Sequence, residues 1–573
     1  MKKIVKLLKE NKWIHYGIII VIGILLSLPL INTQIFDTHD GIFHIIRLQG
    51  VGNAIASGEI PPVIAPNLCL SFGYAVNLFY PILATYLPLL VKLFCTSYVV
   101  VLKLFGAFCI ILSGITMYHF SYQVTKKREI ALLASIFYLI APYKLGDVYR
   151  RYAIGEFIAL AFLPILFQGL YNLFRQDGKK HYYIAIGASL LVLSHTITTF
   201  YVAIFSFIYV LCNIKKLKDK QIIKKLLINV TFIILISTVF WLPIIETAKS
   251  TDYAMFNSDI MNTAKEYVTQ NTVDIEEFWQ EKEQLKEIEI NLGLPTIIAF
   301  LIGIYAIWKL DKEYKQIYVI FNLFALMCLW MTTKYFPWEY MPDVFYKIQF
   351  PWRMVGFCNF FASLVCGINI WIVGKNLMKK EELQIGFAIV IIVASVACTL
   401  PMLDKYAKED KNVTEFFEKK VLTKQLQTFI ATNKDYLPMK TTKSLITYTM
   451  NRENRTYVLE GQAEISNEEK QNLTASMELS NVIQGTKLEL PFIYYLGYEV
   501  KLTVGENVNS LKVVESEHGY VSVELTENIE QGKLEVKYEG TFLTKLAYGV
   551  SILAIIALAV YITRERHTHK VLN

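Results

Sequence analysis

Long apolar stretches recur along most of this chain and are separated by short polar loops, many of them basic. A perpendicular helix needs about 20 apolar residues to cross the hydrocarbon core of a bilayer, and these windows approach or reach that length. The pattern predicts a polytopic α-helical membrane protein with about 12 transmembrane helices. We expect the spans at residues 14–31, 98–121, 129–142, 154–174, 182–194, 197–213, 224–245, 291–309, 316–333, 354–374, 384–402 and 542–562.

One further apolar stretch, 73–95, is predicted not to cross the membrane. It carries Pro81 and Pro88 among many aromatic residues, which is typical of helices that lie in the membrane interface. When this stretch is left out of the count, every basic loop falls on one side, as the excess of Lys and Arg in cytoplasmic loops requires. Both termini are then cytoplasmic, and the first span, which has no small-residue cleavage site after it, is expected to be an anchor.

This topology divides the chain into a transmembrane part, an outer segment and a final helix with a short basic tail. The expected boundaries are 1–403, 404–540 and 541–573, with outer loops at 32–97, 246–290 and 334–353. The outer segment is acidic, with 22 acidic and 17 basic residues, and alternating apolar and polar positions such as 499–504 predict a β-sandwich there. Its beginning, 411–432, has a more helical pattern.

Composition and charge support this fold class. The 573 residues are 54% hydrophobic, with a mean hydropathy of +0.38, outside the range of soluble domains. The net charge of +8 is distributed over the expected cytoplasmic loops without a basic domain, which argues against nucleic-acid binding. The eight cysteines lie almost entirely in or beside apolar stretches, show neither zinc-finger spacing nor a disulfide framework, and are absent from the outer segment. A cysteine-free outer segment is compatible with a bacterial cell surface.

A short polar run after the first span carries the strongest functional signal. Asp37, Asp40, His44 and Arg47 are three or four residues apart, so a helix would place them on one face. Ionisable side chains on an otherwise apolar helix at a membrane surface cost free energy and usually have a function.

Further polar residues are expected on the same side of the membrane. Arg150, Arg151 and Glu156 lie in one outer loop, His195 lies between two short spans, and Arg353 begins another span. Arginines at outer helix ends run against the usual bias toward the cytoplasmic side, which indicates a purpose. Guanidinium groups bind phosphate bidentately, and a lipid-linked phosphate in the outer leaflet is a natural ligand.

Each of these residues also has a purely structural interpretation. Outer charges often only mark the boundary with water, and Lys144 and Asp147 are compatible with a solvated turn. His195 is compatible with a histidine whose hydrogen bonds are satisfied at the interface. The functional interpretation rests on the gathering of these residues on one side.

A divalent metal ion is a further alternative at the first polar run. Asp37, His39, Asp40 and His44 offer carboxylate and imidazole ligands. However, His39 points away from the face that Asp40 and His44 share on a helix, and a zinc site usually has three or four convergent ligands.

The motifs of the membrane region resemble a known family. Together with Asp40, His44 and Arg47, they are similar to those of the bacterial membrane proteins labelled 6-pyruvoyl-tetrahydropterin synthase-related. The matching runs are GYAVNLFYP at 73–81, APY at 141–143, RRYAIGE at 150–156 and QFPWR at 349–353. The outer segment, with LPFIYY at 490–495 and GY at 497–498, resembles the C-terminal domain of this group and of YfhO-type proteins. The label implies no activity, because the named synthase is a small soluble zinc enzyme built quite differently.

The resemblance implies an architecture similar to that of GT-C glycosyltransferases. In that fold an acidic residue of the first outer loop acts at the sugar-transfer site, interfacial helices follow, and the donor is a polyprenyl-phosphate sugar. Here Asp40, or Asp37, occupies the matching place, and 73–95 matches the interfacial helices. The implied location is the plasma membrane of a bacterium. The implied partners are membrane lipid, a polyprenyl-phosphate-linked sugar and an envelope glycopolymer or glycolipid acceptor.

The first hypothesis is therefore a glycosyltransferase acting outside the cell, in which a carboxylate takes the proton of the acceptor hydroxyl and arginines stabilise the leaving lipid phosphate. Its expected residues are the base Asp40 or Asp37 and the substrate- or phosphate-binding residues His44, Arg47, Arg150, Arg151, Glu156, His195 and Arg353. A transporter or flippase of a lipid-linked substrate is the second hypothesis, although the internal repeat that it predicts is not evident. The third is a non-catalytic envelope factor whose outer domain binds glycan or a partner protein.

Overall fold

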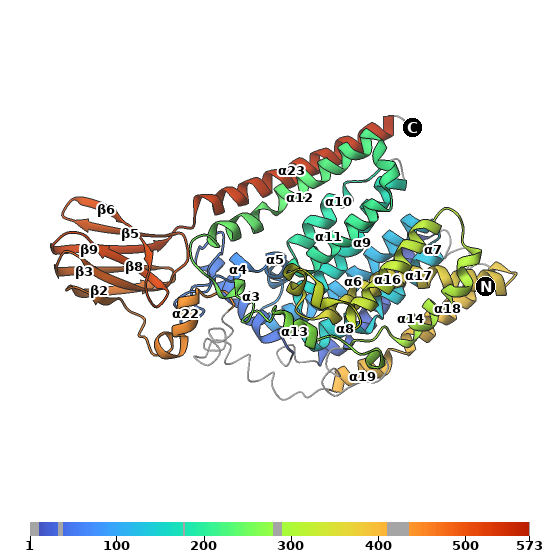
Figure 1. The fold of residues 1–573 in the computed structure, drawn as a ribbon, viewed down its shortest axis with the longest axis horizontal. Coiled ribbons are helices and arrows are strands. Elements are labelled where there is room, and N and C mark those ends of the chain that lie inside the picture. Colours follow the sequence, from blue (N-terminus) through green and yellow to red (C-terminus); the bar gives the residue numbers. More distant parts are fainter. Residues whose placement is uncertain (1–10, 33–37, 176–177, 279–288, 409–434, 572–573) are drawn as a thin grey trace.

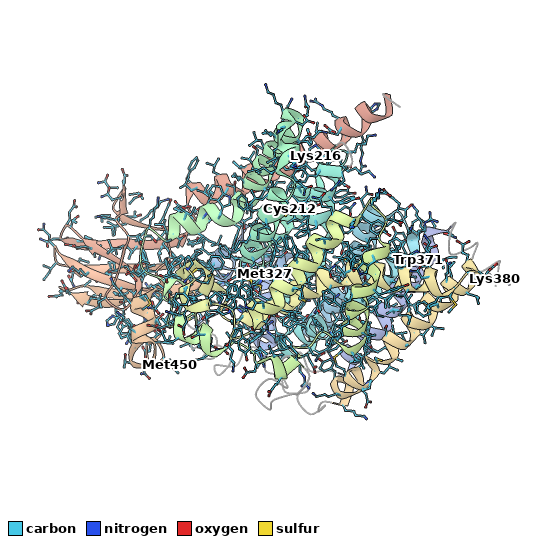
Figure 2. The ribbon with its side chains drawn as sticks, turned by 45° about the vertical axis from the view of Figure 1, so that its right-hand side comes forward. Cys212, Lys216, Met327, Trp371, Lys380 and Met450 are labelled. Atoms are coloured by element: carbon cyan, nitrogen blue, oxygen red, sulfur yellow. The ribbon has the colours of Figure 1, made fainter. Side chains whose placement is uncertain are left out.

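A body of helices and two β-sheets make up the two ends of the molecule (Figure 1). The computed structural model describes residues 11–571 except 33–37, 176–177, 279–288 and 409–434. Short helices, among them α3 (Gly41–Ala56), α4 (Val76–Phe79) and α13 (Lys265–Gln270), lie between the helical body and the sheets. Lys380 lies at the end of the molecule opposite the sheets, whereas Met450 lies beside them (Figure 2).

Eight helices in the described part of the chain are long and apolar enough to cross a membrane. They cover Lys12–Ile31, Tyr98–Thr125, Ile154–Arg175, Lys220–Thr247, Lys315–Thr332, Pro351–Leu377, Glu381–Lys408 and Phe542–His567. A ninth span results if Arg128–Leu139 and Pro142–Arg151, which meet at a bend of 50°, are counted as one. The prediction of a polytopic helical membrane protein is therefore confirmed.

The expected number of 12 crossings is not confirmed. Every expected span coincides with a helix, but α10 (Tyr183–Val192), α11 (Thr196–Leu211) and the helical segment Leu294–Lys309 are short. At a rise of about 1.5 Å per residue, the 10 residues of α10 cover only half of a bilayer core about 30 Å thick. Hydropathy alone does not distinguish such helices from full spans, because both are apolar.

Helices α9 (Ile154–Arg175) and α17 (Met354–Leu377) form the centre of the helical body. All of the apolar window of α17 and 94% of that of α9 are buried, against 22% for the C-terminal helix α23 (Phe542–Val571). Glycine lets α9 and α10 approach closely, since a Cβ on Gly187 would lie 2.4 Å from the backbone nitrogen of Leu166. Helix α23 lies along α12 (Lys220–Thr247) at the outside of the body (Figure 1).

The remaining helices of the body connect these elements. They are α2 (Lys12–Ser27), α5 (Leu83–Lys92), α6 (Tyr98–Thr125), α7 (Arg128–Leu139), α8 (Pro142–Gly146), the π-helical turn η3 (Asp147–Arg151), α14 (Leu294–Leu301), α16 (Lys315–Thr332), α18 (Glu381–Ala397) and α19 (Leu400–Lys408). The stretch expected to lie in the interface forms α4 and α5, with Pro88 inside α5. Both helices are too short to cross a bilayer.

Nine antiparallel strands form the C-terminal sheets. They are β1 (Tyr457–Glu460), β2 (Glu464–Gln471), β3 (Thr474–Val482), β4 (Thr486–Ile493), β5 (Tyr498–Val504), β6 (Asn507–Leu511), β7 (Val514–Glu515), β8 (Tyr520–Leu525) and β9 (Ile529–Tyr538). One sheet has the order β1-β4-β8-β7 and the other β2-β3-β9-β5-β6. The alternating burial along β5 agrees with the expected pattern, and the helical pattern at 411–432 lies outside the described residues.

The sheets dock on a tight loop that precedes α4. The backbone N–H of Ile493 donates to the carbonyl of Phe72 at 3.0 Å, and the Phe72 ring packs edge-on against Tyr520. Three consecutive residues of this loop, 69–71, have positive φ angles of 52°, 57° and 67°. This left-handed turn presents Phe72 to the sheets. The β region is thus joined to the helical body by side-chain packing as well as by the chain itself.

Candidate functional site

Asp40 lies at the start of α3 and is tied to a second predicted segment. It is the N-terminal cap residue of the helix, and its backbone N–H donates to the carbonyl of Arg151 at 2.8 Å. The N–H of His39 donates to the carbonyl of Arg150 at 3.2 Å. These hydrogen bonds bring two polar motifs together that are more than a hundred residues apart in the sequence.

The expected polar face of α3 is only partly directed at one site. His44 lines the same cavity as Asp40, but Arg47 is buried behind the cavity wall, with its guanidinium 3.8 Å from the centre of the Tyr80 ring. Asp37 lies outside the described residues. Helix α3 begins at Gly41, so Asp40 precedes the helical stripe that the spacing suggested.

A buried ion-pair network forms the floor of the site. The Arg151 guanidinium lies 2.6 Å from Asp147 and 3.0 Å from Glu156, and Glu156 also lies 3.3 Å from Arg353. The Tyr143 hydroxyl donates to Glu156 at 2.6 Å. Each carboxylate is therefore held by charged or hydroxyl donors, as buried charges require.

Asp147 and Lys144 do not form the solvated turn that their sequence suggested. Both are buried, because the segment after Pro142 folds back into α8 and η3 inside the helical body. The Lys144 ammonium hydrogen-bonds the Ser113 hydroxyl and lies 4.3 Å from the centre of the Tyr138 ring. The apolar neighbours of these residues in the sequence are core positions, which carry the polar side chains inward with them.

The adjacent arginines of η3 point to different places. Arg151 lines the cavity, whereas the Arg150 guanidinium lies 5.2 Å from the ring centre of Tyr406 in α19. Arg150 is not among the residues that line the cavity. A helical turn separates neighbouring side chains by about 100°, so two consecutive arginines cannot serve one pocket equally.

His195 reaches the cavity from the start of α11. Its Nδ1 accepts the Thr198 backbone N–H at 3.3 Å and lies 2.7 Å from the Thr198 hydroxyl. Burial lowers the pKa of His195 to about 3, although the Glu156 carboxylate opposes this shift. The neutral ring that accepts at Nδ1 carries its proton on Nε2. His195 is thus a neutral hydrogen-bond donor beside Glu156.

Burial also sets the protonation of Asp40 and His44. It raises the pKa of Asp40 above the usual range of an aspartate, while the positive charges of Arg151 and Arg353 partly offset the rise. It lowers the pKa of His44 well below its usual range, and the charge of Arg47 adds to this effect. Asp40 is consequently a stronger base than a solvated aspartate once it is ionised.

The cavity has a volume of about 1120 Å³ and a polar rim. Arg353 at its wall donates to the Gln349 side chain at 2.8 Å and to the Ile348 carbonyl at 2.7 Å. Gln349 itself has φ 63° and ψ −52°, in a tight turn closed by the Phe350 N–H. Farther out, Lys347 donates to Thr263, and Lys334 forms an ion pair with Asp274 at 2.6 Å.

Sequence reasoning missed several cavity residues, among them Asp435 and Tyr436. Asp435 and Tyr436 enter the wall from the segment that leads into α22 (Met439–Ser444) and the β region. Their sequence context is an ordinary polar stretch without periodicity or motif, so only the fold reveals them. The cavity therefore combines residues from the expected outer loops 32–97, 246–290 and 334–353, from the segments around Arg151 and His195, and from the approach to the sheets.

No metal site is evident in the part of the chain that the structure describes. Groups of three or more His, Cys, Asp and Glu side chains that could hold an ion are absent there. Asp40 and His44 share the cavity but lack a third such ligand among the described residues. Asp37, another carboxylate that the sequence offered as a ligand, lies outside the described residues.

Comparisons with known proteins find a matching family of membrane proteins. A family model described as "6-pyruvoyl-tetrahydropterin synthase related domain; membrane protein" matches residues 78–403, which confirms the resemblance expected from the motifs. An uncharacterised protein of Lactococcus lactis subsp. cremoris (strain MG1363) is 29% identical over 345 residues, which are 58% of this chain and 55% of that protein. The chain thus spans about half the length of this relative.

The solved structures that are similar include two of an archaeal enzyme. The oligosaccharyltransferase AglB from Archaeoglobus fulgidus, in complex with an inhibitory peptide and a dolichol-phosphate, has a TM-score of 0.42 and 13% identity, covering 74% of this chain and 60% of that one. The apo form of the Archaeoglobus fulgidus oligosaccharyltransferase has a TM-score of 0.37 and 11% identity, covering 72% and 60%.

Proposed function

This chain belongs to the family of membrane proteins described as 6-pyruvoyl-tetrahydropterin synthase related, and we propose that it is a glycosyltransferase. The reaction moves a sugar from a polyprenyl-phosphate donor to a cell-envelope acceptor on the outer face of the membrane. Residues 1–403 are then the transmembrane domain, 404–540 the outer domain and 541–573 the final span with its tail, and both termini are cytoplasmic.

A single observation carries the proposal: an unpaired carboxylate and two guanidinium groups share one large cavity. Asp40 is in the cavity wall together with Arg151 and Arg353, and Asp40 has no ion pair within the described residues. Sugar transfer from a phosphate needs these two kinds of group, a base for the acceptor and positive charge for the leaving phosphate. The cavity volume of about 1120 Å³ is sufficient for a phosphosugar and part of an acceptor.

In the proposed reaction Asp40 accepts the proton of the acceptor hydroxyl, and the hydroxyl oxygen attacks the anomeric carbon of the sugar. The bond between that carbon and the phosphate oxygen breaks, and the electron pair leaves with the lipid phosphate. Arg353 and Arg151 stabilise the charge that develops on this phosphate, and Glu156 holds both guanidinium groups in place. The proton remains on Asp40 until solvent removes it.

The rim of the cavity supports an acceptor from the aqueous side. Lys334 and Lys347 are exposed residues of the cavity lining, and with Asp274 they offer charged contacts to a hydrophilic chain. The donor keeps its lipid in the membrane, so transfer must occur where the helical body meets water. The position of α3 and α13 between the helices and the sheets fits this requirement (Figure 1).

The test compares cells that lack this protein and are complemented by wild type, by Asp40→Asn or by the matched control Asp404→Asn. Asp404 lies in α19 and pairs with Lys408 at an exposed site outside the cavity. Mass spectrometry measures surface polymers and lipid-linked sugars. We expect one sugar to be missing with Asp40→Asn while its lipid carrier accumulates, and to be restored with Asp404→Asn. An unchanged glycan profile with Asp40→Asn contradicts the proposal and favours transport or binding.

A further inference from the structure

Asp435 adds a carboxyl to a cavity that Asp40, Glu156 and Asp274 also line, and it lies almost four hundred residues after Asp40 in the sequence. The segment that holds it leads directly into α22 and the sheets, whereas Asp40 belongs to the first outer loop. Both side chains line the same space. Neither has an ion pair with a Lys or Arg in the described parts of the chain, unlike Glu156 and Asp147.

The backbone beside Asp435 is held from three directions. The N–H of Tyr436 donates to the Tyr74 hydroxyl at 3.3 Å, and the Tyr495 hydroxyl of the β region donates to the Tyr436 carbonyl at 3.0 Å. The Tyr436 ring stacks on Phe79 with 5.7 Å between the ring centres. A residue next to so many fixed contacts has a defined position, which a group that binds a ligand requires.

The next residues join this anchor to a third loop. The N–H of Ala254 donates to the carbonyl of Leu437 at 3.0 Å, and the N–H of Met439 donates to the backbone carbonyl of Asp252 at 2.8 Å. The loop after Ala254 continues into the cavity wall at Met255. The β region, the wall and Asp435 are therefore one connected unit.

The surroundings of Asp435 favour its neutral form. Burial, with the nearby charge of Asp40, raises the pKa of Asp435 to about 7. Among the described residues, the phenols of Tyr74 and Tyr436 also face it, and both are neutral at this pH because burial raises their pKa well above the usual range. Two neighbouring carboxyls do not both ionise readily.

We propose that Asp435 is the second functional carboxyl of this cavity and donates a hydrogen bond to a phosphate oxygen of the lipid-linked phosphosugar while Asp40 acts as the base. The β region thus completes the site through the residue at its entrance. This inference rests on the proposed function for the identity of the ligand. The hydrogen bond transfers no proton, since Asp435 keeps its hydrogen throughout the reaction.

The ligand explains why a neutral carboxyl is useful at this position. An ionised Asp435 would repel the phosphate and could only accept hydrogen bonds, whereas the neutral acid supplies one donor. Asparagine has the same size and also donates, so it substitutes for the neutral acid but not for a carboxylate. Alanine removes the donor. These three states make the proposal testable without knowledge of the natural acceptor.

The first experiment measures binding of farnesyl-phosphoglucose, a phosphodiester whose charge is constant near neutral pH, to the purified full chain at pH 6 and pH 9. We expect wild type to lose about tenfold in affinity at the higher pH, the effect of about one unfavourable charge. Asp435→Asn should bind equally at both values, and Asp435→Ala weakly at both. Farnesol and the exposed variant Asp404→Asn serve as controls. An Asn variant as weak as the Ala variant, or a wild type without pH dependence, overturns the proposal.

The second experiment observes the carboxyl pair directly and does not depend on sugar transfer. Infrared spectra of protein labelled with carbon-13 aspartate should contain a protonated carboxyl band that titrates near pH 7 and is missing in Asp435→Asn. In Asp40→Asn this titration should move to lower pH, because the neighbouring negative charge is gone. An unmoved titration overturns the pairing. If the pairing is observed but Asp40→Asn keeps its sugar transfer, the proposed function fails and the carboxyl pair remains.

Discussion

The Arg151 guanidinium lies 2.6 Å from the carboxylate of Asp147, one helical turn before it, and both side chains are buried. The same guanidinium contacts Glu156, which also contacts Arg353. Two positive and two negative groups thus balance in charge. Asp40 stands outside these pairs at the wall of the same cavity. A paired carboxylate is a weak base, so the network itself favours Asp40 over Glu156 as the proton acceptor.

Breaking this pair should destabilise the protein strongly. Asp147→Asn removes one charge and leaves Arg151 with Glu156 as its remaining anion, and removal of one partner from a buried pair typically costs about 3–5 kcal/mol. Thermal unfolding of the detergent-solubilised protein measures the effect. Asp404→Asn, which breaks the exposed pair with Lys408, should change stability by only about 0–1 kcal/mol. Equal losses in the two variants would contradict the assignment of a tight network.

Gly155 should be intolerant of even a methyl group. A Cβ at this position would lie 2.8 Å from both the Ser194 carbonyl and the Tyr80 hydroxyl, and 3.2 Å from the His195 ring. Gly155→Ala should therefore displace His195 or Tyr80 from the cavity wall, cost about 1–3 kcal/mol and reduce activity. Gly386→Ala is the matched control, because a Cβ there meets no atom within 4 Å. A Gly155→Ala protein with unchanged melting temperature and glycan profile would refute the close packing of this wall.

Replacement of Arg353 and replacement of Arg150 should have different effects on ligand affinity. Arg353 contacts Glu156, Gln349 and the Ile348 carbonyl at once, which a lysine cannot reproduce. Arg353→Lys should weaken the binding of farnesyl-phosphoglucose by about tenfold or more. Arg150→Lys should leave it nearly unchanged, since Arg150 packs against Tyr406 in α19. Titration calorimetry on both variants checks this difference. Equal weakening would show that Arg150 also contributes to phosphate binding.

Much of the fold could be predicted because helices and strands follow from patterns within short stretches of the sequence. Apolar windows identify helices in a membrane protein, and alternation along 499–504 identifies a strand such as β5. The number of crossings could not be predicted, because α10 is as apolar as a full span but has only 10 residues. The length of a helix depends on the residues at which it begins and ends, and hydropathy does not determine these residues.

The site was partly predictable for a similar reason. Asp40, His44, Arg151, Glu156, His195 and Arg353 were chosen from the sequence and line one cavity. Arg47 and Arg150 were chosen by the same argument but point elsewhere, because helical phase within a short turn decides the direction of a side chain. Asp435 was missed, because Asp40, whose charge acts on it in the folded protein, is nearly four hundred residues away in the sequence.

Replacement of Asp40 should stabilise the protein while it abolishes transfer. Burial raises the pKa of Asp40 in the folded state, so between the usual aspartate pKa and this raised value the unfolded chain releases its proton while the folded protein keeps it. Wild type therefore loses stability as the pH rises through that window, by about 1.4 kcal/mol for each pKa unit of the shift, and Asp40→Asn does not. In melting curves from pH 3.5 to pH 8, the melting temperature of Asp40→Asn should rise relative to that of wild type as the pH rises. Asp404→Asn should have the same pH dependence as wild type. A constant offset at all pH values would contradict a raised pKa. A more stable but inactive variant is what a functional, rather than structural, carboxylate predicts.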